Sequence, residues 1–358
     1  MTAIDLGLPQ LGGLDGVPTT EDKQTAKDFT SDQEVRWCPG CGDYAVLAAV
    51  RQFLPTLGIR RENTVFVSGI GCSSRFPYYL DTYGMHSIHG RAPAIATGLA
   101  VTRPDLSVWV VTGDGDALSI GGNHLIHALR RNVNMTILLF NNRIYGLTKG
   151  QYSPTSEVGK ITKSTPMGSV DHPFNPVSVA LGAEASFVGR AIDSDRAGLT
   201  TVLQAAAAHR GTALVEIFQD CPIFNDGSFD VLRRGDEAAE RLIPLTHGEP
   251  IRFGPKDDDG LGTYAVVQEG FGLSVAKTDE VPADHIVVHD ETDHNLAWAL
   301  SRLSDQDLTH TVTGIFRQVA RPTYDDAARA QVEQAKQARP DPDLQALLNG
   351  RDTWTVVG

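Results

Sequence analysis

Apolar runs rich in β-branched residues alternate with longer segments suited to helices through the first two thirds of the chain. Buried strands are expected at 63–69, 108–112, 135–140 and 211–219, with shorter strands near 85–90 and 185–188. Helices are expected at 44–57, 91–100, 118–131, 176–183 and 194–209. This alternation predicts an α/β fold, with an open, mainly parallel sheet and helices on both of its faces.

The two ends of the chain differ from this central part in composition and in the periodicity of their apolar residues. Residues 1–30 are polar, aperiodic and punctuated by Gly and Pro, so we expect an arm that is disordered or laid over a partner. Beyond residue 230 the sequence is looser and more charged, with weak strands expected at 264–267 and 284–289 and a polar helical tail stopped once by Pro340. The predicted organisation is an arm at 1–30, a domain at 31–230 and a looser C-terminal extension at 231–358 that contacts partners.

Polar residues follow two of the predicted strands where each one ends. Gly113, Asp114 and Gly115 follow the strand at 108–112, and an Asn-Asn pair follows the strand at 135–140. A right-handed crossover would place both groups on one edge of the sheet, where open α/β sheets bind ligands. Carboxylate and amide oxygens suit Mg²⁺, and the glycines let backbone N–H groups approach phosphates. A tight turn alone would explain Gly-Asp-Gly, but the spacing and the Asn pair favour a diphosphate held through a metal.

This arrangement closely resembles the thiamine diphosphate binding motif. The resemblance implies that Asp114, Asn142 and the carbonyl oxygen of Ile144 hold the Mg²⁺ ion. The long loop beyond Asn142, rich in Gly, Ser, Thr and Pro, is expected to be functional because it leaves the same edge of the sheet.

Composition narrows the classes of function. The chain has 358 residues, 41% of them hydrophobic, which is ample for a buried core. It shows no apolar run of about 18 residues and no signal-peptide pattern at its start, so a cytoplasmic location without a membrane is expected. The net charge of −13 argues against nucleic acid or an anionic membrane as a partner, although solubility alone would explain it.

Four cysteines are present, and disulfides are not expected in a cytoplasmic chain. Cys38 and Cys41 lie in a turn at the start of the domain, and Cys72 and Cys221 lie just past the ends of predicted strands. Four thiolates suit zinc or an iron–sulfur cluster, and buried free cysteines are the plain alternative. We favour one cluster because redox chemistry beside a thiamine diphosphate site is coherent. A second cluster is not expected, since the closely spaced ferredoxin run of four cysteines is absent.

Several separated motifs between residues 31 and 225 resemble the β subunit of a 2-oxoacid:ferredoxin oxidoreductase, most closely the 2-oxoglutarate type. They are CPGCG at 38–42, IGCSS at 70–74, HGRA at 89–92, GDGD at 113–116, NN at 141–142, YGLT at 145–148 and QYSPT at 151–155. The resemblance implies a thiamine diphosphate-binding fold with one [4Fe–4S] cluster on the four cysteines. It also implies cofactor contacts at Ile70, Gly71, Cys72, Ser73, His89, Gly90, Arg91, Ala92, Gly115, Asp116, Gly146 and Leu147.

The reaction implied by the resemblance is the coenzyme A-dependent oxidative decarboxylation of 2-oxoglutarate to succinyl-CoA and CO₂. Electrons would pass through the cluster to ferredoxin. Thiamine diphosphate also needs a Glu on its aminopyrimidine, from a pyrimidine-binding domain that is not visible in this sequence. We therefore expect an α subunit that supplies this domain and its activating Glu.

The choice of substrate depends on a cation for the second carboxylate of 2-oxoglutarate. Arg75 is the first candidate, followed by Arg143 and Lys149, and a plain surface charge is the alternative for each. His89 and Leu147 complete the residues expected at the reaction centre. Other readings stay open: pyruvate or another 2-oxoacid as substrate, a non-redox thiamine diphosphate decarboxylase or synthase subunit, and a non-enzymatic zinc-binding subunit.

Overall fold

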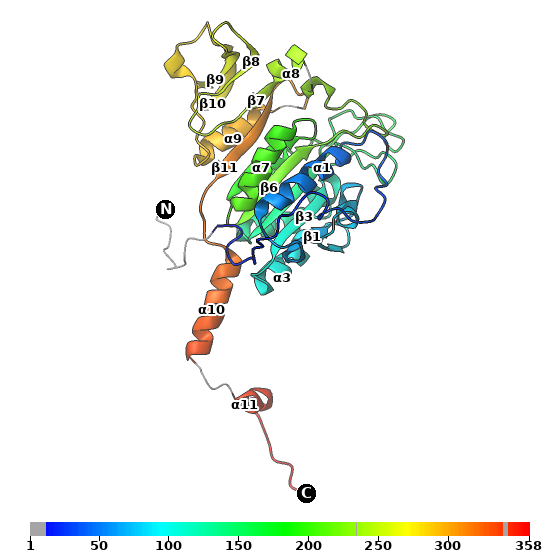
Figure 1. Ribbon diagram of the computed structural model, residues 1–358, viewed down its shortest axis with the longest axis vertical. Coiled ribbons are helices and arrows are strands. Elements are labelled where there is room, and N and C mark those ends of the chain that lie inside the picture. The colour runs from blue at the N-terminus through cyan, green and yellow to red at the C-terminus, as the bar shows by residue number, and fades with distance from the viewer. Residues whose placement is uncertain (1–11, 234, 305, 339–342) are drawn as a thin grey trace.

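The computed structural model describes residues 12–233, 235–304, 306–338 and 343–358. Within them an eight-stranded sheet has the order β2-β1-β3-β4-β6-β5-β11-β7. Its strands are β1 (Thr64–Ser68), β2 (Tyr83–His86), β3 (Ser107–Gly113), β4 (Met135–Asn141), β5 (Phe187–Ile192), β6 (Thr212–Phe218), β7 (Leu242–Pro244) and β11 (Thr311–Gln318). Neighbouring strands are parallel except β11 and β5 (Figure 1). The predicted open, mainly parallel α/β sheet is confirmed.

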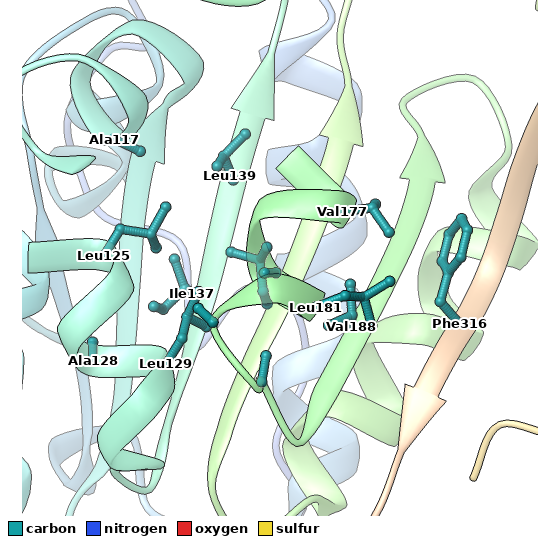
Figure 2. Packing of buried hydrophobic residues seen from close by; sticks show 14 of the residues in the cluster. Ala117, Leu125, Ala128, Leu129, Ile137, Leu139, Val177, Leu181, Val188 and Phe316 are labelled. Carbon is teal, nitrogen blue, oxygen red and sulfur yellow. The ribbon is translucent and has the colours of Figure 1, made fainter. Parts of the chain in front are cut away.

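Helices cover both faces of this sheet because its central strands are apolar on both sides. In β1, Val65 and Val67 pack into one core and Phe66 packs into the other. The first core contains residues of α3 (Ala92–Thr102), α5 (Gly122–Arg131), α6 (Pro176–Gly182) and α9 (His294–Leu303). The second contains residues of α1 (Asp43–Phe53) and α7 (Arg196–Ala208). Figure 2 shows the first core, where Leu125 of α5 and Val177 of α6 lie over Ile137 of β4 and Val188 of β5.

Two predicted helices are shorter than expected. The helix predicted at 118–131 begins only at Gly122, as α5, because a turn that packs closely against the backbone separates it from the short helix α4 (Asp114–Leu118). A Cβ atom on Gly121 of that turn would lie 2.4 Å from the carbonyl oxygen of Asp116. The helix expected at 44–57 ends at Phe53 and continues as a 3₁₀ turn, η1 (Leu54–Leu57), in which Pro55 has no N–H for an α-helical hydrogen bond.

Part of the expected C-terminal extension is built into the main sheet. Strand β11 pairs with β5 and β7 pairs with β11, so residues beyond 230 supply two of its strands. After α8 (Gly235–Arg241), a separate antiparallel sheet contains β8 (Arg252–Lys256), β9 (Gly262–Glu269) and β10 (Gly272–Lys277). The predicted strand at 264–267 lies in β9. The strand predicted at 284–289 is wrong, because this segment forms a 3₁₀ turn and pairs only through the isolated bridges of Ile286 and Val288.

The helical tail is confirmed by α10 (Tyr324–Ala338) and α11 (Leu344–Asn349), which extend away from the domain in Figure 1. Pro340 lies outside the described residues. At the other end, residues 12–30 pack on their own domain, which corrects the expected disorder. Phe29 is fully buried, and the backbone of Gly13 donates to Ala208. The rest of the predicted arm, residues 1–11, is not described. No helix in the described part of the chain is long and apolar enough to cross a membrane.

Candidate active site

Strands β1, β3, β4 and β6 end at one edge of the sheet because they are parallel and in register. Gly113 at the end of β3 pairs with Phe140 of β4, and Asn141 at the end of β4 pairs with Phe218 of β6. The segments that follow these strands carry most of the residues predicted for the site. They enclose two adjoining pockets, which we call the diphosphate pocket and the cysteine pocket.

The diphosphate pocket contains most of the predicted cofactor contacts. Its lining includes Ile70, Gly71, Cys72, Ser73, His89, Gly113, Asp114, Gly115, Asp116, Asn142, Ile144, Gly146 and Leu147. Three predicted contacts do not line it. The backbone N–H of Gly90 donates to Asp116, the guanidinium of Arg91 donates to the carbonyl oxygens of His89 and Ile120, and Ala92 is buried in α3.

Asp114 begins α4 and is held by two hydroxyl groups from the long loop after β4. Its Oδ2 lies 2.5 Å from the Oγ of Ser153 and 2.6 Å from the Oγ1 of Thr155. Burial raises the pKa of Asp114 to about 6, although both hydroxyl groups act against this rise. A buried carboxylate held in one orientation is a suitable ligand for a hard cation. A bound metal ion would in turn keep the carboxylate ionised despite its burial.

The two asparagines that follow β4 have different environments. Asn142 lines the diphosphate pocket, its Nδ2 donates to Gln219 over 3.0 Å, and its Oδ1 accepts from the N–H of Ile144 over 3.2 Å. Asn141 instead donates to Glu216 over 2.7 Å. Asn142 is therefore available to a ligand in the pocket, whereas Asn141 supports the sheet beneath it.

Asp116 joins separate segments around the pocket. Its carboxylate accepts from Thr112 over 2.9 Å and from the backbone N–H groups of Gly90 and Ile70 over 2.8 and 3.3 Å, and it lies 3.2 Å from the Nδ1 of His89. The segments after β1 and β2 are thus tied to α4 by one buried side chain.

Tyr145 covers Gly115 from the loop after β4. Its hydroxyl donates to the carbonyl oxygen of Gly115 over 3.1 Å, and a Cβ atom on Gly115 would lie 2.1 Å from the tyrosine ring. Glycine is therefore required at this position so that the ring can close over the backbone.

All four cysteines line the cysteine pocket. The turn from Cys38 to Cys41 is closed by a backbone hydrogen bond of 3.1 Å, and the indole N–H of Trp37 donates to the carbonyl oxygen of Cys72 over 2.7 Å. Burial, together with the charges of Asp43, Cys221 and Cys38, raises the pKa of Cys72 to about 11. The four cysteines therefore lie around a single, partly buried pocket.

The thiols do not, however, converge on a point. In the part of the chain that is described, no three His, Cys, Asp or Glu side chains are grouped so that they could hold a single metal ion. The thiols surround a space instead, and Gly146 closes that space, since a Cβ atom there would lie 3.4 Å from the Sγ of Cys72 and 3.8 Å from the Sγ of Cys221.

The candidate cations for a substrate carboxylate are separated in the structure. Arg75 and Lys149 line the cysteine pocket, and the guanidinium of Arg75 donates to the carbonyl oxygen of Arg36 over 2.9 Å. Arg143 is directed away, because its guanidinium donates to the carbonyl oxygen of Gln306 and lies over the ring of Phe229. Arg143 lines neither of these two pockets, so Arg75 and Lys149 are the two candidates that lie within them.

Three supporting residues were not identified from the sequence. Ser153 and Thr155 lie in the QYSPT motif, where their hydroxyl groups could have been considered as partners for Asp114. Gln219 directly follows β6 and lies two residues before Cys221, yet no residue pattern indicates that its side chain turns toward Asn142.

Comparison with known proteins agrees with this geometry. Residues 69–217 match the family model described as thiamine pyrophosphate enzyme, C-terminal TPP binding domain. The chain is 72% identical over 361 residues to 2-oxoglutarate oxidoreductase subunit KorB of Mycobacterium tuberculosis, covering 99% of this chain and 95% of that protein. It is 44% identical over 223 residues to the 2-oxoacid:ferredoxin oxidoreductase subunit beta of a Sulfolobus species, covering 62% and 72%.

A solved structure has the same fold. The 2-oxoglutarate:ferredoxin oxidoreductase of Magnetococcus marinus, with 2-oxoglutarate, coenzyme A and succinyl-CoA bound, matches with a TM-score of 0.74 and 33% identity. The match covers 94% of this chain and 100% of that one. Because the similarity extends over nearly the whole length at high identity, this chain belongs to the family of β subunits of 2-oxoacid:ferredoxin oxidoreductases.

Proposed function

We propose that this chain is the β subunit of a 2-oxoglutarate:ferredoxin oxidoreductase. The enzyme would convert 2-oxoglutarate and coenzyme A to succinyl-CoA and CO₂ and pass the electrons through one [4Fe–4S] cluster to ferredoxin. The observation that carries the proposal is the sharing of Cys72, Asn142, Gly146 and Leu147 by the diphosphate pocket and the cysteine pocket. Electrons released at one pocket would need to cross only these shared residues to reach the other.

In this proposal Asp114, Asn142 and the carbonyl oxygen of Ile144 hold Mg²⁺, and the pocket around them holds thiamine diphosphate. The donor set fits, since it offers one carboxylate, one amide oxygen and one carbonyl oxygen, and leaves the remaining positions to phosphate and water. When bound, thiamine diphosphate supplies the nucleophile and the electron sink that decarboxylation needs. The protein positions it: Asp116 fixes the segments around the pocket, and Tyr145 closes over Gly115.

The cysteine pocket fits a cluster better than a single zinc ion. Zinc requires its ligands to gather around one point, with sulfur about 2.3 Å from the metal. In a [4Fe–4S] cluster each cysteine binds a different iron, so the thiols surround a volume instead. The arrangement of Cys38, Cys41, Cys72 and Cys221 around one pocket supports the second geometry.

The proposed substrate contacts are one residue shared by the two pockets and three residues that each line one of them. We propose that Arg75 and Lys149 attract the second carboxylate of 2-oxoglutarate, while His89 and Leu147 contact the reacting end of the substrate or the cofactor. The proposed partners are an α subunit with the pyrimidine-binding domain and its Glu, ferredoxin, coenzyme A and the 2-oxoacid. A cytoplasmic location, with neither membrane nor nucleic acid as a partner, belongs to the same proposal.

The test is an anaerobic visible spectrum of the chain purified with its α partner. A brown absorbance should decrease when 2-oxoglutarate is added, stay unchanged with pyruvate, and respond further to coenzyme A. If the absorbance decreases with pyruvate but not with 2-oxoglutarate, the substrate is a 2-oxoacid other than 2-oxoglutarate. A colourless complex that binds thiamine diphosphate would indicate a non-redox decarboxylase or synthase subunit. A colourless chain that holds zinc and binds no thiamine diphosphate would reject the proposal altogether.

A further inference from the structure

Gln219 lies between the two pockets and contacts a residue of each. It directly follows β6, and only 1% of the residue is exposed. Its Nε2 donates to the Sγ of Cys41 over 3.2 Å and to the carbonyl oxygen of Asp220. Its Oε1 accepts from the Nδ2 of Asn142 over 3.0 Å. One buried amide therefore joins a proposed cluster ligand to a proposed magnesium ligand.

The orientation of this amide is fixed by its neighbours. The carbonyl oxygen of Asp220 can only accept, so the atom facing it must be the nitrogen of Gln219. The oxygen of Gln219 consequently faces Asn142, and only the nitrogen of Asn142 can donate to it. This leaves the Oδ1 of Asn142 on the other side, where it accepts from Ile144, the second proposed magnesium ligand of this loop.

Each half of the amide has a separate consequence. A hydrogen bond to a cluster sulfur stabilises the negative charge that accumulates on reduction, so it favours the reduced state. A partner that orients a metal ligand typically changes metal affinity or activity by about 10- to 100-fold when it is lost. Both of the N–H donors of Gln219 are used, one by Asp220 and one by Cys41.

We propose that Gln219 is a positioning residue for both cofactors, which raises the reduction potential of the cluster through Cys41 and orients Asn142 toward Mg²⁺. This inference rests on the proposed function, because it needs a cluster on the cysteines and thiamine diphosphate with Mg²⁺ in the neighbouring pocket. It assigns no proton or electron transfer to Gln219 itself.

Two substitutions separate the two roles. Gln219→Leu removes the donor and the acceptor together. Gln219→Glu keeps an oxygen that can accept from Asn142, but the ionised carboxylate has no proton to donate, so the bond to sulfur is lost. Gln52→Leu, the same change on the exposed surface of α1, is the matched control.

The experiment uses the anaerobic complex of the full chain with its α partner. The midpoint potential of the cluster is measured by redox titration followed by electron paramagnetic resonance, and the dissociation constant of thiamine diphosphate is measured at a fixed Mg²⁺ concentration. Gln219→Leu should lower the potential and weaken thiamine diphosphate binding by about 10-fold. Gln219→Glu should also lower the potential, but should bind thiamine diphosphate within about 3-fold of the parent, which is less than the loss typical for a missing orienting partner.

The outcomes are distinct. Unchanged potential and affinity in both variants, with cluster and thiamine diphosphate present in the parent, would overturn the inference and leave the proposed function standing. Equal weakening of thiamine diphosphate binding in both variants would overturn the assigned role of the acceptor oxygen. If Gln219→Leu fails to assemble a cluster, Gln219→Met takes its place, since it keeps the length of the side chain, adds no charge and lacks both the donor and the acceptor. A parent complex without cluster or thiamine diphosphate would instead reject the proposed function.

Discussion

The hydroxyl group of Thr155 lies 2.6 Å from the Oδ2 of Asp114, although 41 positions separate the two residues in the chain. The same hydroxyl lies 2.8 Å from the Oδ1 of Asn141, which in turn donates to Glu216. A buried chain of polar contacts therefore runs from the edge of the sheet into its interior. It couples the proposed magnesium ligand to the packing of β4 against β6.

Substituting Thr155 by valine should weaken the binding of thiamine diphosphate and Mg²⁺. Valine has the same shape but cannot donate to Asp114, so the carboxylate loses one of the two hydroxyl groups that orient it. We expect an affinity about 10-fold lower, as is usual when a partner of a metal ligand is removed. Calorimetric titration at several Mg²⁺ concentrations measures the effect. Thr201→Val on the exposed face of α7 is the control, and equal affinities in the two variants would contradict the assigned role.

Substituting Gly115 by alanine should both destabilise the domain and impair the diphosphate pocket. The added methyl group would lie 2.1 Å from the ring of Tyr145, so the ring or the loop that carries it must move. Overpacking of this kind costs about 1–3 kcal/mol of unfolding free energy. Gly122→Ala at the start of α5 is the matched change, since a Cβ atom there meets nothing within 4 Å.

Denaturant unfolding and thiamine diphosphate titration of both variants check this prediction. The Gly122 variant should match or slightly exceed the parent in stability, because alanine is the better helix residue by about 1 kcal/mol. Wild-type affinity in the Gly115 variant would show that Tyr145 can move without cost to the pocket.

The buried ion pair of Arg190 and Glu216 should behave as a unit. Their side chains are 2% and 0% exposed and lie 2.7 Å apart, and the guanidinium also lies over the rings of Phe218 and Phe316. Arg190→Met should cost about 3–5 kcal/mol of unfolding free energy, because it leaves the charge of Glu216 buried and unpaired. Glu216→Leu should cost a similar amount for the converse reason.

A double-mutant cycle tests this coupling. The variant with both substitutions should lose clearly less stability than the two single losses added together, since it contains no unpaired buried charge. Arg196→Met on the exposed surface provides the control for removing an arginine. Additive losses would mean that each side chain contributes independently of the other.

His209 should make the protein less stable as the pH falls. Burial lowers its pKa to about 4, and its Nε2 lies 2.7 Å from the hydroxyl of Ser186. Below the unfolded pKa of about 6.5 the unfolded chain binds a proton that the folded chain does not. The contribution of His209 to the unfolding free energy is therefore constant above pH 6.5, and it falls by about 3 kcal/mol between pH 6.5 and pH 4.

The readout is the difference in unfolding free energy between the wild type and His209→Gln. This difference removes the effect of all other titrating groups. As the pH falls from 7 to 4, the wild type should lose about 3 kcal/mol of unfolding free energy relative to the variant. A constant difference over this range would show that the imidazole is hydrated in the folded protein.

Local sequence patterns were sufficient for the central sheet and for the location of the site. Strands such as β3 and β4 are continuous apolar runs, and the parallel crossover between them places Asp114 and Asn142 on one edge. Apolar runs are a property of each strand alone, and the right-handed crossover is a general rule of parallel strands, so both could be applied without knowing the rest of the fold.

The remaining parts depend on pairings that no local pattern encodes. Strand β11 contains Gly314 and several polar residues, and it becomes a strand by pairing with β5 more than a hundred residues earlier. Asp116 lines the diphosphate pocket, and no local pattern predicts that its hydrogen bonds also hold together segments from three parts of the chain. Gln219 was missed for the same reason, since its partners are defined only once the strands are assembled.

Both outer segments of the described chain are fastened at the amino edge of the sheet. Gly13 is hydrogen-bonded to Ala208 just before β6, and the N–H of Asn134, just before β4, donates to Asp325 of α10. The candidate site lies at the opposite edge, across strands of seven residues, or about 23 Å. An attachment to a surface through either of these segments would thus leave the edge that carries the proposed cofactors free for the α subunit and for an electron carrier.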